Sequence, residues 1–247
     1  MSFLAVMVVY GLACGCLNTV VTNHAAIHHS SRRMNLLSST WCVGVMSGGW
    51  LMSVGICGPF SWRLGYFFVG ICSFAITVFA VLSRRSWPAD ISRTSSDTTS
   101  GRLSLLVNGV PRLVFFSFMF CALEVCCGVW SCSFMTEHFG SAPVVAARAP
   151  LLYFLGELSG RIAVGVFGKR LADERQIAAG TAIASVGSIV VLASGNAAFA
   201  IAGLFILGFG CGPVYPAMMH RIPAAFPSID SAKVIALVMS VNFISCI

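Results

Sequence analysis

Seven apolar runs, each of about 20 residues, dominate this sequence, and their length limits what the chain can fold into. They cover residues 3–26, 36–57, 64–83, 113–135, 147–168, 176–194 and 197–219, and an eighth begins near Val234 and continues to Ile247. An α-helix of that length crosses the hydrocarbon core of a bilayer. The pattern predicts an all-α polytopic membrane protein with seven complete transmembrane helices and a partial eighth.

The composition agrees with a lipid environment. Of the 247 residues, 57% are hydrophobic and only 9% are charged, whereas a soluble domain carries about 25% charged residues. So little polar surface cannot cover a water-soluble globule, but lipid tolerates exposed apolar side chains. The net charge of +7 lies in short clusters between the apolar runs and forms no continuous stripe, so we expect no nucleic-acid partner.

One long polar stretch, rich in Ser, Thr, Arg and Asp, interrupts the apolar runs. Such a composition cannot bury a core, so we expect a solvated linker there. The predicted organisation is a first helix bundle over 1–83, a linker over 84–111 and a second helix bundle over 112–247.

The basic residues predict the orientation. Twelve Lys and Arg residues fall in one set of alternate loops, and the opposite set holds only Arg63 and Arg148. Because basic loops stay on the cytoplasmic side, we expect the long linker to be cytoplasmic. The predicted location is the plasma membrane, with the chain crossing the bilayer several times.

Small residues recur at four-residue spacing within the apolar runs. The pairs are Gly11 and Gly15, Gly44 and Gly48, and Gly156 and Gly160. Such pairs let two helix backbones approach closely in a membrane. Gly208, Gly210 and Gly212 are of the same kind, and without a preceding strand they do not predict a dinucleotide site.

Five segments together resemble the fucose permease-like branch of the major facilitator superfamily. Residues 202–221 (AGLFILGFGCGPVYPAMMHR) are similar to its tenth transmembrane helix, and residues 152–170 (LYFLGELSGRIAVGVFGKR) to its eighth. Glu124–Trp130 (EVCCGVW) resembles the seventh helix, Ser61–Tyr66 (SWRLGY) the start of the sixth, and Met34–Gly48 the fifth. The segments follow the order and spacing of the family over almost the whole chain.

The resemblance implies that the chain corresponds to helices four to eleven of a twelve-helix protein, without the first three helices and the end. It implies secondary active or facilitative transport of a small hydrophilic solute, a sugar above all, by alternating access. Symport with a proton or a sodium ion fits the branch, and no cofactor and no enzymatic activity are expected. The alternative is a truncated transporter fragment that transports nothing by itself.

Glu124 is the ionisable residue that most strongly suggests function, because it lies in the middle of an apolar run. A charge at that depth is costly and normally faces a bundle interior or an aqueous cavity. We expect it to bind the solute or a proton, the alternative being a structural hydrogen bond. Trp130 follows nearly two turns later, and we expect it around the same side, stacked on a sugar ring or packed in the core.

Glu157 and Arg161 lie four residues apart, so both side chains share one helix face and can pair. The resemblance places Arg161, next to Gly160, at a position that the superfamily uses to latch its two halves. Gating is therefore one expectation and simple charge neutralisation the other. Beyond this position the family usually has an acidic partner for the arginine, and this chain has Gly168 in its place.

Four polar or aromatic residues of the first two runs are further substrate-binding candidates: Asn18, Asn23, Ser38 and Trp41. In the permease that gives the branch its name, a carboxylate stands at the position of Asn18, and amides stand at those of Ser38 and Trp41. The resemblance therefore does not extend to proton coupling through this half of the chain. Asn18 can still hydrogen-bond a hydroxylated solute or a neighbouring helix.

Prolines cluster where the seventh run ends, including Pro213 and Pro216 on either side of Tyr215. A proline removes a backbone hydrogen bond and allows a kink, and transporters place such broken helices near their binding sites. We expect a gating role for the prolines and a gating or binding role for Tyr215.

Histidines at 24, 28 and 29 form an HxxxHH pattern like the iron box of membrane desaturases. That chemistry needs several such boxes, and only the isolated His138 and His220 remain. We therefore expect no metal site and a loop in place of the box.

Overall fold

The computed structural model describes residues 2–57, 63–83, 109–168, 171–227 and 231–244, and all regular structure among them is α-helical. The contacts divide the chain into two compact units, Met1–Cys42 with Leu103–Ile247 and Val43–Arg102. The predicted linker lies outside the described residues except for 109–111, and the predicted domain boundaries stay a prediction.

Every apolar run falls on helical segments. The helices are α1 (Ser2–His28), α2 (Ser31–Cys57), α3 (Arg63–Ser83), α4 (Val110–Phe139), α5 (Pro143–Ala146), α6 (Arg148–Phe167), α7 (Asp173–Leu192), α8 (Ala197–Cys211), α9 (Val214–Ala225) and α10 (Ser231–Ile244). Helices are expected here because lipid offers no partner to a backbone N–H or C=O, and a helix pairs all of them internally. The predicted fold class, an all-α membrane protein, is confirmed.

Five described segments are long and apolar enough to cross a membrane. They are Gly65–Ser83, Val110–Phe139, Pro143–Phe167, Asp173–Leu192 and Ala197–Ala225, and α10 is a shorter apolar helix. The last segment joins α8 and α9 across a break, so one predicted run became two helices. The predicted number of seven complete spans stays a prediction.

The smaller unit comprises the part of α2 beyond Cys42 and the helix α3. Large apolar side chains of this unit are exposed: Trp50 by 67%, Phe74 by 72% and Phe79 by 70%. Such faces suit contact with lipid chains, which accept apolar surface without penalty.

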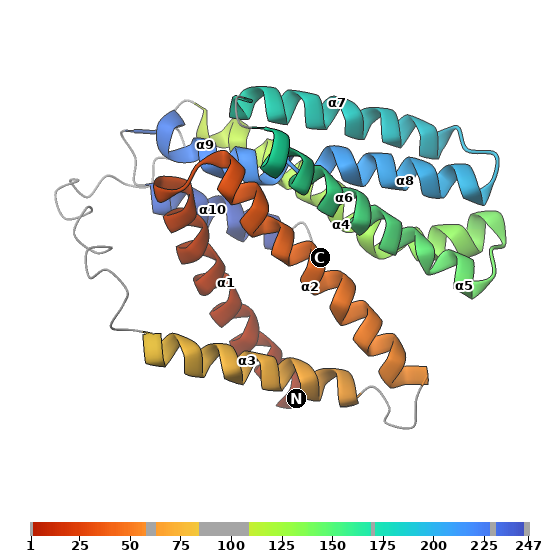
Figure 1. The fold of residues 1–247 in the computed structure, drawn as a ribbon, viewed down its shortest axis with the longest axis horizontal. Coiled ribbons are helices and arrows are strands. Elements are labelled where there is room, and N and C mark those ends of the chain that lie inside the picture. Colours follow the sequence, from red (N-terminus) through yellow and green to blue (C-terminus); the bar gives the residue numbers. More distant parts are fainter. Residues whose placement is uncertain (1, 58–62, 84–108, 169–170, 228–230, 245–247) are drawn as a thin grey trace. The chain divides into compact units, whose positions relative to one another are not determined.

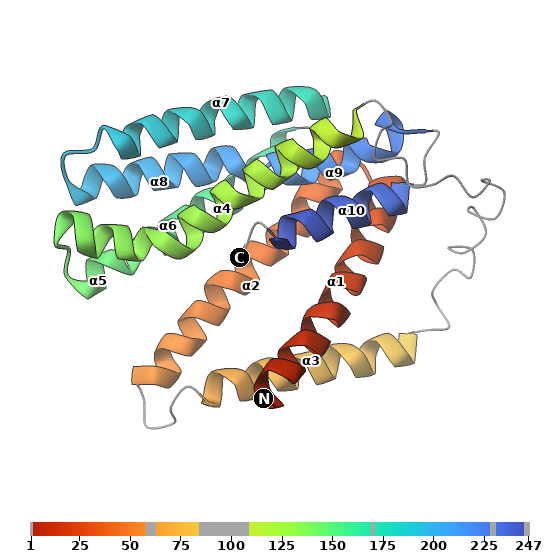
Figure 2. The same ribbon diagram turned by 180° about the vertical axis from the view of Figure 1, so that it is seen from behind.

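In the larger unit, α8 lies between α6 and α7 and packs on both (Figures 1 and 2). Glycines make this packing close: a Cβ added to Gly208 would lie 2.1 Å from the carbonyl oxygen of Tyr153, and one on Gly160 would lie 2.2 Å from that of Phe209. On the α7 side, a Cβ on Gly210 would lie 2.3 Å from the amide nitrogen of Ala184. The close approach predicted for these glycines is found.

The other glycine pairs behave differently. Among the described residues, a Cβ on Gly11, Gly44 or Gly48 would meet no atom within 4 Å, and one on Gly15 would only touch Phe243 at 3.9 Å. Four-residue spacing therefore predicts close helix contact only where a second helix lies over the glycines.

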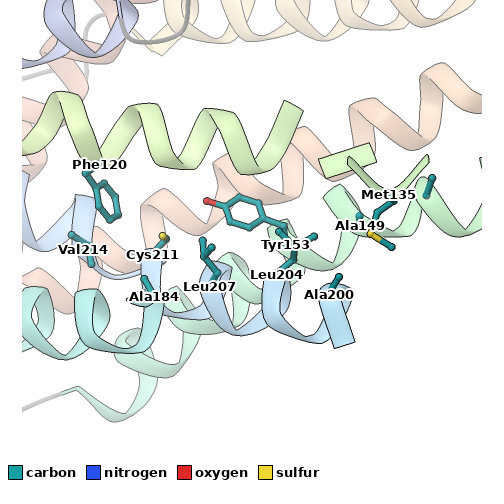
Figure 3. Close-up of a cluster of buried hydrophobic side chains, with 11 residues drawn as sticks. Phe120, Met135, Ala149, Tyr153, Ala184, Ala200, Leu204, Leu207, Cys211 and Val214 are labelled. Carbon is teal, nitrogen blue, oxygen red and sulfur yellow. The ribbon is translucent and has the colours of Figure 1, made fainter. Parts of the chain in front are cut away.

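Two groups of buried side chains hold the larger unit together. The first joins α4, α6, α7 and α8, with the Tyr153 ring near Leu204 and Leu207 and its hydroxyl toward Cys211 (Figure 3). The second joins the end of α1 and the start of α2 to α9 and α10, through residues such as Met34, Met219 and Ile235. The beginning of the chain and its last described helix thus share one core.

The break between α8 and α9 follows from its prolines. Pro213 and Pro216 have no N–H, so the carbonyl groups four residues earlier, on Phe209 and Gly212, lose their helical partners. The chain leaves the α-helix at Gly212–Pro213 and resumes it at Val214. The Gly212 carbonyl oxygen accepts a hydrogen bond from Arg161 of α6 instead.

Candidate substrate and gating site

A buried ion pair lies inside α6. The guanidinium of Arg161 donates a hydrogen bond through Nη2 to Oε1 of Glu157, one helical turn away, and the two side chains are only 4% and 1% exposed. A buried charge requires such a partner, because moving an unpaired ion out of water costs roughly several kcal/mol. The predicted pairing is therefore found, and it is buried well away from bulk water.

Arg161 also donates outside its own helix. Its Nε lies 3.0 Å from the Gly212 carbonyl oxygen that Pro216 deprived of a helical N–H, and its Nη1 lies 2.7 Å from the carbonyl oxygen of Ser38 on α2. The same Nη1 lies 3.3 Å from Sγ of Cys42. One guanidinium thus connects α2, α6 and the break between α8 and α9.

Trp41 completes the surroundings of the guanidinium. Cζ of Arg161 lies 5.5 Å from the centroid of the indole, which is within the range of a cation–π contact. The edge of Phe154 meets the same indole at a centroid distance of 5.8 Å. The indole nevertheless stays 54% exposed, so part of its surface is free to contact a ligand.

Glu124 adds a second carboxylate to this charged group. Its Oε1 is buried without a hydrogen-bond partner among the described residues. The Arg161 guanidinium pairs with Glu157, so this buried oxygen of Glu124 is open to a proton, a cation or a hydrogen-bond donor.

Trp130 is not brought to this group. Its indole is 64% exposed, whereas Oε1 of Glu124 is buried. A separation of six residues in a helix of 3.6 residues per turn places two side chains about 120° apart. The expectation that both lie around the same side was therefore wrong.

The remaining candidates lie in other surroundings. Asn18 is exposed, and its Oδ1 accepts a hydrogen bond of 3.4 Å from the hydroxyl of Thr22 on the same helix. Oδ1 of Asn23 accepts from Ser231 on α10 at 2.9 Å, which is a helix-to-helix hydrogen bond. Tyr215 is partly buried and packs against both hydrophobic cores.

A polar layer that the sequence did not predict lies at the end of this unit where α1 meets α2. Oε1 of Gln176 on α7 accepts hydrogen bonds from Ser31 at 3.2 Å and from Asn35 at 3.3 Å. Arg32 donates to the carbonyl oxygen of Gly165 on α6. Asn35 and Gln176 are 0% and 2% exposed, and amide side chains at the beginnings of two apolar runs were the signal that could have revealed them.

The loop expected at the HxxxHH pattern is wrong, because α1 continues beyond the apolar run and contains His24 and His28, with His29 directly after it. His24 lies beside His28 and His29, with ring centroids 4.5 and 6.0 Å away, while His138 stacks on Phe134. His220 contacts Asp173 instead. In the part of the chain that the structure describes, no three His, Cys, Asp or Glu residues are grouped so that they could hold a metal ion.

Comparison with known proteins gives one match. The family model of the Major Facilitator Superfamily matches residues 1–247, which is the whole sequence. No curated protein and no solved structure matches the chain significantly.

Proposed function

The chain belongs to the major facilitator superfamily, and from that premise we propose that it carries a small hydrophilic solute, a sugar, through the membrane by alternating access. Membership makes it a multi-pass membrane transporter. The identity of the solute, the coupling to an ion and the roles of single residues are our proposals.

The observation that carries the proposal is the buried charged group of Glu124, Glu157 and Arg161. An ionisable side chain in the middle of a membrane helix costs about 2.5–3.5 kcal/mol, so it is rarely present without a function. Arg161 neutralises one carboxylate, and Glu124 keeps a buried oxygen that has no partner in the described part of the chain. We assign Glu124 the binding of a proton, of a sodium ion or of a hydroxyl group of the solute.

Trp41 is the proposed platform for the sugar ring. Its indole lies over the guanidinium of Arg161 and is half exposed, and a flat apolar face with a polar neighbour suits a ring that carries both C–H and O–H groups. Candidates for hydrogen bonds to the solute remain Ser38, Tyr215 and Asn18. Asn23 already accepts a hydrogen bond from Ser231.

Arg161 is the proposed latch. It joins α2, which precedes the linker, to α6 and the α8–α9 break, which follow it. Alternating access requires contacts of this kind to form on one side of the cargo and to break when the opposite side closes. Three further residues support the latch. The missing side chain of Gly160 makes room for the Phe209 carbonyl group. The missing N–H groups of Pro213 and Pro216 leave the Phe209 and Gly212 carbonyl groups without helical partners, and that of Gly212 binds Arg161.

The basic loops support an orientation with the linker in the cytoplasm, and we propose the plasma membrane as the location. A protease added only to the outside of intact cells should leave the linker uncut. Cleavage under those conditions would reverse the orientation.

The proposed role of Glu124 is tested by uptake of labelled hexoses into vesicles that contain the purified full chain, with an inward proton or sodium gradient. Glu124→Gln should lower the initial rate about 10- to 100-fold, because a hydrogen bond to a charged group contributes about 1.5–3 kcal/mol. Glu137→Gln is the matched control, since Glu137 lies on the same helix but is exposed. Equal rates in both variants and the wild type would remove Glu124 from the site.

A further inference from the structure

His220 occupies a position between three helices that the transport site does not use. It lies on α9, its Nδ1 is 2.6 Å from Oδ2 of Asp173 on α7, and its Nε2 is 3.0 Å from the backbone carbonyl oxygen of His29 at the end of α1. The side chains of His220 and Asp173 are only 25% and 16% exposed. Figures 1 and 2 show α9 beside the start of α7 and the end of α1.

Both nitrogens of this ring face acceptors. A carboxylate oxygen and a carbonyl oxygen can only accept hydrogen bonds, and a neutral imidazole has a single N–H. Two bonds of this length therefore need an N–H on each nitrogen, which is the imidazolium form. We propose that His220 is a proton-binding site, and that its protonated ring ties α1 to α7 and α9 at this end of the protein.

The neighbouring charges are compatible with a cation. On α7, Asp173 supplies the counter-charge, and Glu174 is occupied by Arg221 of α9 at 2.8 Å in an exposed pair. Lys233, the charged residue among the described part of α10, is exposed. On α1, the ring of His29 lies against that of His24, and only its carbonyl group reaches His220.

The direction of the pH effect follows from the bonds. In acid the ring keeps both N–H groups, so both hydrogen bonds form and the three helix ends are held together. As the pH rises and the ring loses one proton, one of the two bonds is lost, because a bare ring nitrogen cannot donate. Since α1 precedes the linker and α7 and α9 follow it, acid should favour closure of this end and alkali should favour its opening.

The test compares the melting temperature of the purified full chain in detergent at pH 5.5 and pH 8.0. From pH 5.5 to pH 8.0, the melting temperature of the wild type should fall by about 2–4 °C more than that of His220→Gln. This is the shift expected for one lost hydrogen bond in a chain of this size. Asp173→Asn should resemble His220→Gln. Glu174→Gln removes the adjacent carboxylate without touching His220 and should behave like the wild type.

A second measurement keeps the proposal testable if a variant folds poorly. In the ¹⁵N spectrum of histidine-labelled wild-type protein at pH 7, where a free imidazole is mostly neutral, one of the five histidines should carry protons on both ring nitrogens. Five neutral rings would overturn the proposal, as would identical pH profiles of the wild type and His220→Gln. Neither measurement needs a solute, so the result does not depend on what the protein transports.

Discussion

Arg161 is satisfied by groups from three parts of the chain. Its donors reach one carboxylate, two backbone carbonyl groups and a thiol. One of those carbonyl groups is available only because Pro216 stands four residues after Gly212. A flexible ammonium on lysine could not replace the flat guanidinium there, because arginine presents its donors in a fixed fork.

The pair of Arg161 and Glu157 gives the first prediction. Arg161→Met should destabilise the protein by about 3–5 kcal/mol, because it leaves the Glu157 carboxylate buried without its counter-charge. Adding Glu157→Gln should recover most of this loss, since the amide needs no counter-charge. Unfolding of both variants in detergent measures the effect.

Arg221→Met is the control for that experiment. Arg221 pairs with Glu174 at 2.8 Å, but the two side chains are 47% and 62% exposed, and such a surface pair contributes about 0–1 kcal/mol. If Arg161→Met cost no more than Arg221→Met, the buried pair would have no special importance for stability.

At the scale of helices, the glycines of α8 set how closely α6 and α7 can approach. Gly208 faces the backbone of α6 and Gly210 faces that of α7. Two positions apart, they lie on different sides of one helix. Close backbone contact also places Gly212 within reach of Arg161, so the same packing positions the charged group.

Gly208→Ala tests this packing. The new methyl group would lie 2.1 Å from the carbonyl oxygen of Tyr153, a backbone atom that cannot move aside alone, so we expect a loss of about 1–3 kcal/mol. The matched control is Gly44→Ala, whose methyl group meets no atom of the described chain within 4 Å. Alanine is the better helix former by about 1 kcal/mol, so the control should be unchanged or more stable, and equal melting temperatures for both variants would contradict the close packing.

The apolar runs predicted where the helices lie, but they did not predict which helices and side chains contact one another. The runs overlap most of α1, α4 and α7, which begin before them, because the length and apolar character of a membrane helix are local properties. The spacing of Glu157 and Arg161 predicted their pairing for the same reason. Contacts of Arg161 with Ser38 and Cys42, more than 100 residues away, depend on tertiary packing and leave no pattern in a single sequence.

At the scale of the whole molecule, a membrane bundle with a charged group inside it is arranged for carrying a solute. The described spans have mean hydropathies from 1.3 to 2.2, and Glu124, Glu157 and Arg161 lie within two of them. Lipid contact explains the exposed apolar faces, but it gives no reason for an unpaired buried carboxylate oxygen. We propose that a cargo or a coupling ion binds there.

The most direct test of this account is hexose counterflow. Vesicles containing the purified full chain are loaded with unlabelled hexose and diluted into a trace of labelled hexose without any ion gradient. Alternating access predicts a transient accumulation of label above the outside concentration, with none in protein-free vesicles. If vesicles that contain inserted, folded protein accumulate no more label than empty ones for every hexose tested, the claim that this chain transports sugars is contradicted.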